Sequence, residues 1–85
     1  MTRPVRVLFF ATARTAVGRA EVDWPVPPGG ISAAALAGEL ETAYPALART
    51  LVTSRLVRNG RYVRRRSERV RPGDEFAIHP PYGGG

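Results

Sequence analysis

The chain has 85 residues, a hydrophobic fraction of 44% and a formal net charge of +6. A chain of this length can build one small domain around one modest core, and its composition is that of a globular protein. Cysteine is absent, which excludes a disulfide framework, a thiolate metal site and a cysteine nucleophile within these residues. Because His79 is the one histidine and the acids are scattered, we expect neither a metal cluster nor a self-contained catalytic centre.

The charge of the chain comes from arginine alone, with thirteen arginines against seven acids. This balance favours an acidic partner, either nucleic acid or an acidic protein face. Arg3 and Arg6 precede an apolar run and an Ala11-Thr12-Ala13 triplet, which imitates a short signal peptide. The run is too short for one, and no stretch reaches membrane-spanning length. We therefore expect a soluble, cytoplasmic protein.

The first predicted element is a strand over residues 5–11, which are rich in β-branched and aromatic side chains. At a period of two, one face carries Val5, Val7 and Phe9 and the other carries Arg6, Leu8 and Phe10. Arg6 indicates water on the second face, so Leu8 and Phe10 are expected on an outer surface, as a patch for a partner. The alternative is an ordinary core, with the two faces reversed.

A turn and a second strand are predicted next. Gly18 indicates a turn over residues 13–19, and clean alternation over residues 20–26 indicates a half-buried strand. This strand is expected to run antiparallel to the first if the connection is a hairpin. Pro25 predicts an edge position or the strand's end, because proline cannot donate a hydrogen bond to a neighbouring strand.

One main helix is predicted after the break at residues 27–30. Ser32 can cap its N-terminus, and the helix runs to about Ala43 and ends near Tyr44, because Pro45 cannot continue it. The apolar residues at helical spacing are Leu36, Leu40, Ala43 and Leu47. Residues 45–49 are expected to form a further short turn.

The C-terminal half is predicted to be rich in strands. Asn59-Gly60, a strong hairpin signal, separates strands at residues 56–58 and 62–64. A turn at residues 71–74 leads into a last strand at residues 76–79. The order β-β-α-β-β-β predicts an α+β fold of two layers, with one main helix on a mixed sheet. If the last strand runs beside the first, the chain end projects beyond the sheet.

The chain closes on Pro80-Pro81-Tyr82-Gly83-Gly84-Gly85. Consecutive glycines form a thin, flexible segment, and the two prolines stiffen its base. An ordinary frayed end is one interpretation. The other is a working end that enters a narrow cleft of another protein. In that case the Gly85 carboxylate is the reactive group, once a partner enzyme activates it by adenylation.

Three stretches of the sequence resemble the small subunit of molybdopterin synthase, one of the ubiquitin-like sulfur carriers. They are VLFFATAR (7–14), NGRYV (59–63) and PGDEFAIHPPYGGG (72–85). The similarity spans nearly the whole chain, and the last stretch is the specific one because its spacing to the chain end matches without a gap. The resemblance implies one β-grasp domain over residues 1–85, with a flexible glycine tail at residues 83–85.

The resemblance also implies a sulfur-carrier function. Gly85 would be adenylated by an E1-like activating enzyme that uses ATP, and then converted to a thiocarboxylate with a sulfurtransferase. The tail would enter the large synthase subunit, in a heterotetramer, and donate sulfur to precursor Z in molybdenum cofactor biosynthesis. The catalytic side chains would belong to the large subunit, and this chain would itself bind no cofactor or metal.

The same resemblance yields the expected site residues. Gly83 and Gly84 would thread into the partner. The expected partner contacts are Leu8, Phe10, Arg14, His79, Pro80, Pro81 and Tyr82. Arg14 is included only because of the resemblance. From the sequence pattern alone it would be an ordinary solvated charge, as most surface arginines are. His79 alternates with Ile78, so it is expected to point outward beside the patch. We do not expect it to act as a general base.

Departures from the family pattern keep a sister pathway open. Tyr82 stands where valine is usual, and His79 stands where an apolar or aromatic residue is usual. Gly83 makes a triple glycine, and Thr15 follows Arg14 where the family often has an acid. Sulfur carriers for thiamin, cysteine or tRNA thiolation also end in Gly-Gly. One of these pathways is therefore the alternative.

The run from Arg61 to Arg71 raises a different alternative, a small RNA-binding module. Val63 and Val70 are expected to be packing anchors, and aromatic residues are not interleaved through the run. The pattern therefore favours a solvated arginine-rich face and argues against nucleic acid. A ubiquitin-like protein modifier is a third alternative. The chain has no lysine, so no side-chain amine of its own can accept an isopeptide bond.

Overall fold

The computed structural model describes residues 2–81, so the predictions made for Tyr82, Gly83, Gly84 and Gly85 lie outside the described residues. The main sheet has five strands in the order β2-β1-β7-β4-β5. These strands are β1 (Val5–Phe9), β2 (Glu21–Trp24), β4 (Arg55–Arg58), β5 (Arg61–Tyr62) and β7 (Glu75–His79). A small second sheet pairs β3 (Ile31–Ser32) with β6 (Arg69–Val70).

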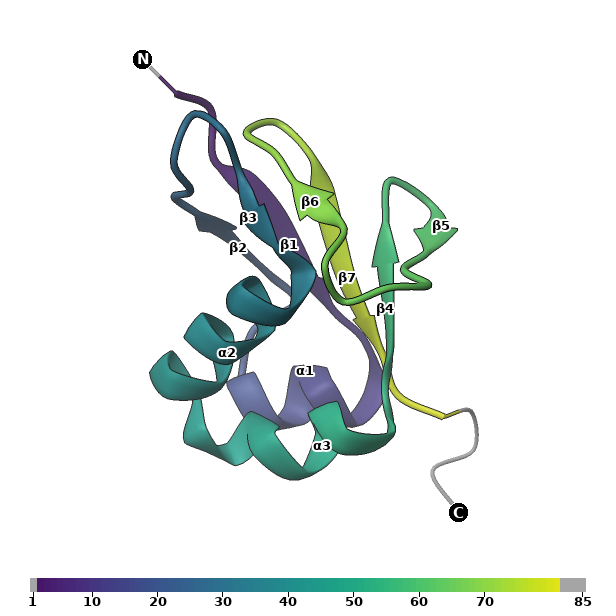
Figure 1. The fold of residues 1–85 in the computed structure, drawn as a ribbon. Coiled ribbons are helices and arrows are strands. Elements are labelled where there is room, and N and C mark those ends of the chain that lie inside the picture. The colour runs from purple at the N-terminus through teal and green to yellow at the C-terminus, as the bar shows by residue number, and fades with distance from the viewer. Residues whose placement is uncertain (1, 82–85) are drawn as a thin grey trace.

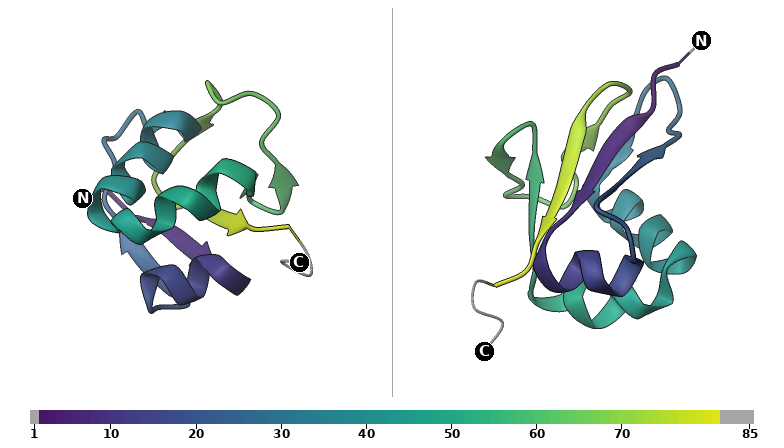
Figure 2. Two further views of the ribbon diagram at one scale, coloured as in Figure 1. Left: turned by 90° about the horizontal axis from the view of Figure 1, so that it is seen from below. Right: turned by 180° about the vertical axis from the view of Figure 1, so that it is seen from behind.

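The helices lie on one face and at one end of the main sheet. Figure 1 shows the main helix α2 (Ala33–Ala43) beside the strands, with α1 (Ala11–Val17) and α3 (Ala48–Thr53) across the lower end. Seen from behind, β1 and β7 lie in front and α2 lies behind them (Figure 2). Among residues 2–81, no helix has the length and apolar character needed to span a membrane.

The first and last strands of the main sheet lie side by side at its centre. β1 runs parallel to β7, with Arg6 opposite Glu75 and Phe9 opposite Ile78. β2 and β4 pair antiparallel on the two outer sides. The predicted α+β fold, with a main helix on a mixed sheet, is therefore confirmed. The chain leaves the sheet from a central strand, and Pro80 and Pro81 continue from the end of β7 (Figures 1 and 2).

The core lies between the sheet and α2. From the sheet, Val5, Val7, Phe9, Phe76 and Ile78 are at most 2% exposed, and from α2 Leu36 and Leu40 are fully buried. The two predicted anchors of the arginine-rich run also pack here. Val70 is fully buried and Val63 is partly buried against the core.

The prediction of a turn over residues 13–19 is wrong, because most of this segment belongs to α1. Ala13 is fully buried, so tertiary packing stabilises a helix where the local signal is weak. Gly18 does reverse the chain, but as the C-cap of α1, with φ 80° and its N–H donating to the Arg14 carbonyl at 2.8 Å. The connection from β1 to β2 is therefore helical rather than a tight hairpin.

β2 lies at the edge of the sheet and antiparallel to β1, as predicted, although it ends before Pro25. Its Trp24 is tied to the main helix, because the indole Nε1–H donates to Oε1 of Glu39 at 2.8 Å. The ring of Tyr44 lies against both Trp24 and Phe9, with centroids 6.4 and 6.0 Å away. These contacts fix the edge strand on α2.

The main helix begins and ends where the sequence predicts. The Ser32 hydroxyl accepts a hydrogen bond from the Ala35 N–H at 3.0 Å, and the helix stops at Tyr44 because Pro45 follows. The short turn predicted at residues 45–49 is a 3₁₀ turn, Pro45–Leu47, which continues into α3. α3 was not predicted as a helix.

Two turns link the last strands, and both were predicted. Asn59 and Gly60 have φ values of 49° and 81°, so they form the two-residue loop between β4 and β5. In the turn before β7, the Asp74 N–H donates to the Arg71 carbonyl at 3.0 Å, and Gly73 has φ 87°.

The carboxylate of Asp74 joins these two turns. It accepts hydrogen bonds from the Arg71 N–H at 2.8 Å, the Asn59 amide at 3.1 Å and the Arg58 guanidinium at 3.3 Å. Partial burial raises the pKa of Asp74, but the hydrogen bonds from Arg71 and Asn59 and the charge of Arg58 outweigh that effect. The pKa of Asp74 therefore lies below its ordinary value.

Candidate functional site

The residues predicted for an outer patch lie on the face of β1 that does not pack on α2. Leu8 is half-buried, and Phe10, which directly follows β1, is 41% exposed. The alternating residues Val5, Val7 and Phe9 fill the core. The predicted face assignment is confirmed, whereas a role of Leu8 and Phe10 in partner binding stays a prediction.

Phe10 and His79 are in direct contact. Their rings stack with centroids 4.3 Å apart and an interplanar angle of 26°. The backbone holds them in register, because the Phe10 N–H donates to the carbonyl of Ile78 at 3.3 Å. His79 is the last residue of β7 and is exposed, as predicted, and Pro80 and Pro81 follow it directly. The stack therefore lies at the point where the chain leaves the sheet.

The apolar surface continues across the sheet from Leu8. In the strand register, Leu8 lies opposite Ala77, Ala77 opposite Val57, and Val57 opposite Tyr62. We call this row, together with Phe10 and His79, the outer face. Tyr62 is 61% exposed, Val57 is half-buried and Ala77 is buried. The sequence could have revealed Tyr62, because a two-residue Asn59-Gly60 loop places Val57 and Tyr62 opposite each other.

Arg14 lies one helical turn after Phe10, since its N–H is bonded to the Phe10 carbonyl at 3.4 Å. Its side chain is exposed on α1. The structure thus brings Leu8, Phe10 and His79 onto one face, with Arg14 nearby along the chain and Pro80 and Pro81 after them. Tyr82 and the three glycines lie outside the described residues.

The outer face is aromatic and aliphatic in character. Within residues 2–81, no group of three histidine or acidic side chains could hold a metal ion. His79 stacks on the ring of Phe10. The titratable group whose pKa is lowered, Asp74, lies before β7, whereas Phe10 and His79 lie at the other end of that strand. The geometry therefore gives an exposed aromatic and aliphatic surface beside the point where the chain leaves the sheet.

These features define a class of protein, the ubiquitin-like β-grasp domains, in which parallel first and last strands lie at the centre of a sheet packed on one main helix. The chain belongs to the ThiS family, whose model matches residues 7–85.

Relatives of the chain cover nearly its full length. The chain is 29% identical over 86 residues to the molybdopterin synthase sulfur carrier subunit of Dictyostelium discoideum, covering 100% of both chains. It is 35% identical over 82 residues to the protein of the same name from Chlamydomonas reinhardtii, covering 95% of this chain and 98% of that one. The crystal structure of SAMP1 from Haloferax volcanii has a TM-score of 0.81 and 27% identity, covering 95% and 98% of the two chains. The resemblance stated from the sequence is confirmed.

Proposed function

We propose that this chain is the sulfur-carrier subunit of a molybdopterin synthase. The observation that carries the proposal is the full-length match to two proteins of that name, together with a family match that extends to residue 85. The outer face supports it, because it exposes aromatic and aliphatic side chains beside the strand end from which the tail starts. We place the protein in the cytoplasm on the same grounds.

In this proposal, the chemistry takes place at Gly85. A carboxylate is a poor electrophile, so an E1-like partner transfers the adenylyl group of ATP to it and releases pyrophosphate. A sulfur nucleophile supplied by a sulfurtransferase then attacks the acyl carbon, and AMP leaves. The resulting thiocarboxylate enters the large synthase subunit, in a heterotetramer, through the thin segment of Gly83 and Gly84. There it donates sulfur to precursor Z. ATP is a substrate of the activating enzyme and not a cofactor bound to this chain.

The folded part of the chain holds and presents this tail. Pro80 and Pro81 restrict the backbone directly after β7. The stack of Phe10 on His79 fixes the end of the strand from which the tail starts. Leu8, Phe10 and Tyr82 then contact the partner enzymes, with Arg14 beside them.

Intact-mass spectrometry tests the proposal. The chain is co-expressed with the adenylating enzyme and the sulfurtransferase from the same genome, and the expected mass change is one oxygen replaced by one sulfur. A variant with one alanine added after Gly85 is the control, and it should stay unmodified while its circular dichroism is unchanged. Sulfur transfer that persists with the blocked end would contradict the mechanism.

A protein modifier is the second candidate, because small archaeal modifier protein 1 of H. volcanii shares the fold at a TM-score of 0.80 and 25% identity. A modifier would form covalent adducts on the lysines of other proteins, visible on denaturing gels.

A sister sulfur pathway differs in the partner enzyme. Co-purification of a molybdopterin, thiazole or cysteine synthase component therefore separates these pathways from the proposed one.

A further inference from the structure

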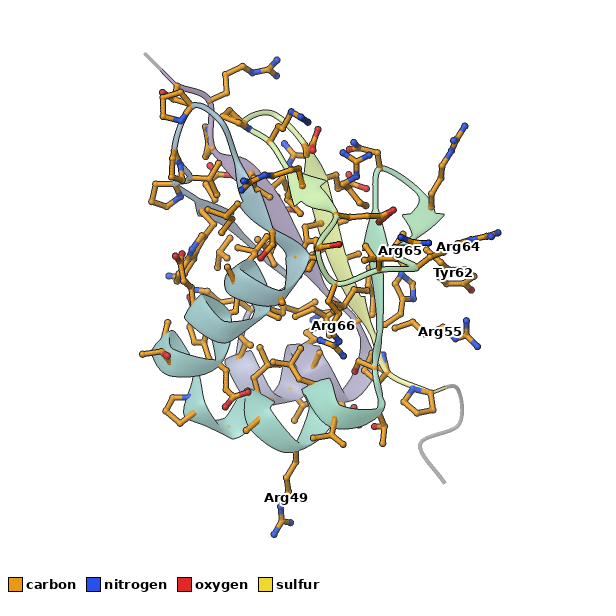
Figure 3. The ribbon with its side chains drawn as sticks, in the orientation of Figure 1. Arg49, Arg55, Tyr62, Arg64, Arg65 and Arg66 are labelled. Carbon is orange, nitrogen blue, oxygen red and sulfur yellow. The ribbon has the colours of Figure 1, made fainter. Side chains whose placement is uncertain are left out.

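A groove lies at the β4–β5 side of the main sheet. We call it the arginine groove. It has a volume of about 190 Å³ and is lined by Ser54, Arg55, Leu56, Tyr62, Val63, Arg64 and Arg66. Its three arginines come from two separate chain segments and are all exposed. Figure 3 shows Arg55, Tyr62 and Arg64 together on the β5 side of the molecule, whereas Arg49 points away from α3.

Within residues 2–81, the arginines of the groove form no ion pair, and Glu68 lines a neighbouring hollow together with Arg64. Among residues 2–81, the ion pairs are Arg6–Glu21 and Arg58–Asp74, and neither involves a groove arginine. Arg55 is positioned by an aromatic ring instead, because its guanidinium carbon lies 5.0 Å from the ring centroid of Tyr62. Figure 3 shows Arg55 and Arg64 close together at this site, with Arg66 nearer the helices, and exposed arginines that line a concave site favour a ligand that carries carboxylate or phosphate oxygens.

The arginine groove borders the outer face. Tyr62 belongs to both surfaces, since it lines the groove and lies opposite Val57 in the sheet. Arg55 lies opposite His79, and His79 stacks on Phe10. A protein seated on the outer face therefore reaches the groove at Arg55 and Tyr62.

An acidic protein segment suits the groove better than nucleic acid. Single-stranded nucleic acid binds through several stacking rings, whereas the groove offers Tyr62 alone, with Arg55 already over its ring. Glu21 and Asp23 alternate with the buried Val22 on β2, so they lie on the same side of the sheet as the outer face and would repel a phosphate backbone laid across it. Tyrosine and arginine beside aliphatic residues are a composition typical of protein interfaces.

We propose that the arginine groove binds an acidic segment of the adenylating enzyme that acts on the tail, and so orients and accelerates docking of that enzyme on the outer face. This inference rests on the proposed function, because it requires a partner that receives the chain end. Charges at the rim of an interface act chiefly on the association rate, and salt weakens that effect by screening. The groove should therefore contribute speed and orientation, while the outer face contributes the lifetime of the complex.

The test compares two triple variants of equal charge. The groove variant combines Arg55→Gln, Arg64→Gln and Arg66→Gln. The control combines Arg3→Gln, Arg19→Gln and Arg49→Gln, at exposed positions outside the groove. Association with the adenylating enzyme of the same genome is measured by biolayer interferometry at about 50 and about 300 mM NaCl. We expect the groove variant to associate about tenfold more slowly at low salt and to lose most of its salt dependence, with dissociation nearly unchanged.

ATP–pyrophosphate exchange, which measures adenylation of the wild-type chain, distinguishes failure of the proposed function from failure of this inference. If the wild type is not adenylated, the proposed function fails and this inference fails with it. If it is adenylated and the two triple variants associate at equal rates with equal salt dependence, this inference alone is overturned. A third outcome also overturns the inference. If the groove variant alone loses binding to a uridine oligonucleotide while its association with the partner is unchanged, the groove binds nucleic acid.

Discussion

The ring of Phe10 stacks on the imidazole of His79, with the two centroids 4.3 Å apart. These residues mark the ends of two parallel central strands, β1 and β7, so one contact joins both strands where the chain leaves the sheet. An aromatic pair of this kind contributes about 0.5–1.5 kcal/mol beyond the area that it buries. The stack is exposed on the outer face, and its partner-binding role can therefore be tested without disrupting the core.

Replacing Phe10 by alanine should weaken partner binding far more than it weakens the fold. Phe10 is 41% exposed, so we expect a loss of about 1 kcal/mol in unfolding free energy. Removing an aromatic side chain from the centre of an interface should weaken the affinity for the adenylating enzyme by about 30-fold, or about 2 kcal/mol. Isothermal titration calorimetry and urea unfolding measure the two effects separately.

The control for this change is Val52→Ala. Val52 is a large apolar residue on α3 that is 81% exposed and lies outside the outer face. It should leave both the affinity and the unfolding free energy within about 0.5 kcal/mol of the wild type. Equal affinities for the two variants would remove Phe10 from the docking surface.

Asp74→Asn should destabilise the protein in a pH-dependent manner. The amide replaces an acceptor that receives three hydrogen bonds, so the expected loss at pH 7 is about 1–3 kcal/mol. The folded pKa of Asp74 is lowered, so its stabilisation is complete above the unfolded pKa of about 3.9 and is lost as the pH falls through the folded value. The gap between wild type and variant in urea unfolding should therefore shrink below about pH 4. A gap that stays constant down to acid pH would disprove this assignment.

Gly30→Ala should be strongly destabilising, whereas Gly29→Ala should not. Gly30 has φ 79°, and a Cβ placed there would overlap the carbonyl oxygen of Val70 in the neighbouring strand β6. Backbone strain and overlap together are expected to cost about 2–4 kcal/mol. A Cβ at Gly29 meets open space, so its change should stay within about 0.5 kcal/mol. Thermal unfolding of the two variants gives the comparison, and similar melting temperatures would contradict it.

Glu39→Ala should loosen the edge strand from α2. The carboxylate accepts the indole N–H of Trp24 at 2.8 Å, and the loss of this exposed hydrogen bond should cost about 1 kcal/mol. Glu41→Ala, on the same helix, removes an acid for which the structure shows no such bond. Trp24 is the one tryptophan of the chain, so its fluorescence follows both unfolding curves. If Glu41→Ala costs as much as Glu39→Ala, helix charge rather than the hydrogen bond explains the loss.

Local sequence signals predicted those parts of the fold in which one residue type has one main structural use. Ser32 and Pro45 marked the ends of α2, and Asn59-Gly60 marked the hairpin, because each fixes a backbone conformation or a hydrogen bond. α1 and α3 were missed because they are short helices, stabilised by burying Ala13 and Leu51 rather than by their own propensity. The small sheet of β3 and β6 depends on a long-range pairing that no local pattern reveals.

The candidate site was predictable where alternation along one strand was enough. Leu8 and Phe10 followed from the period of β1, and the outward direction of His79 followed from that of β7. Their contact did not follow, since it requires the parallel register of two strands from opposite ends of the chain. Arg55 was overlooked although the predicted Asn59-Gly60 hairpin pairs Val57 with Tyr62, and Arg55, two residues before Val57, lies on the same face of β4.

The parallel pairing of β1 with β7 also sets the order in which the protein can be completed during synthesis. Of the described strands, β1 is synthesised first and β7 last, so the centre of the sheet stays incomplete until β7 emerges from the ribosome. A chain truncated before residue 75 would therefore lack a central strand of the sheet, and we expect it to aggregate rather than to fold. The strand from which Pro80 and Pro81 continue therefore takes its native place only after the helices and the other described strands have been made.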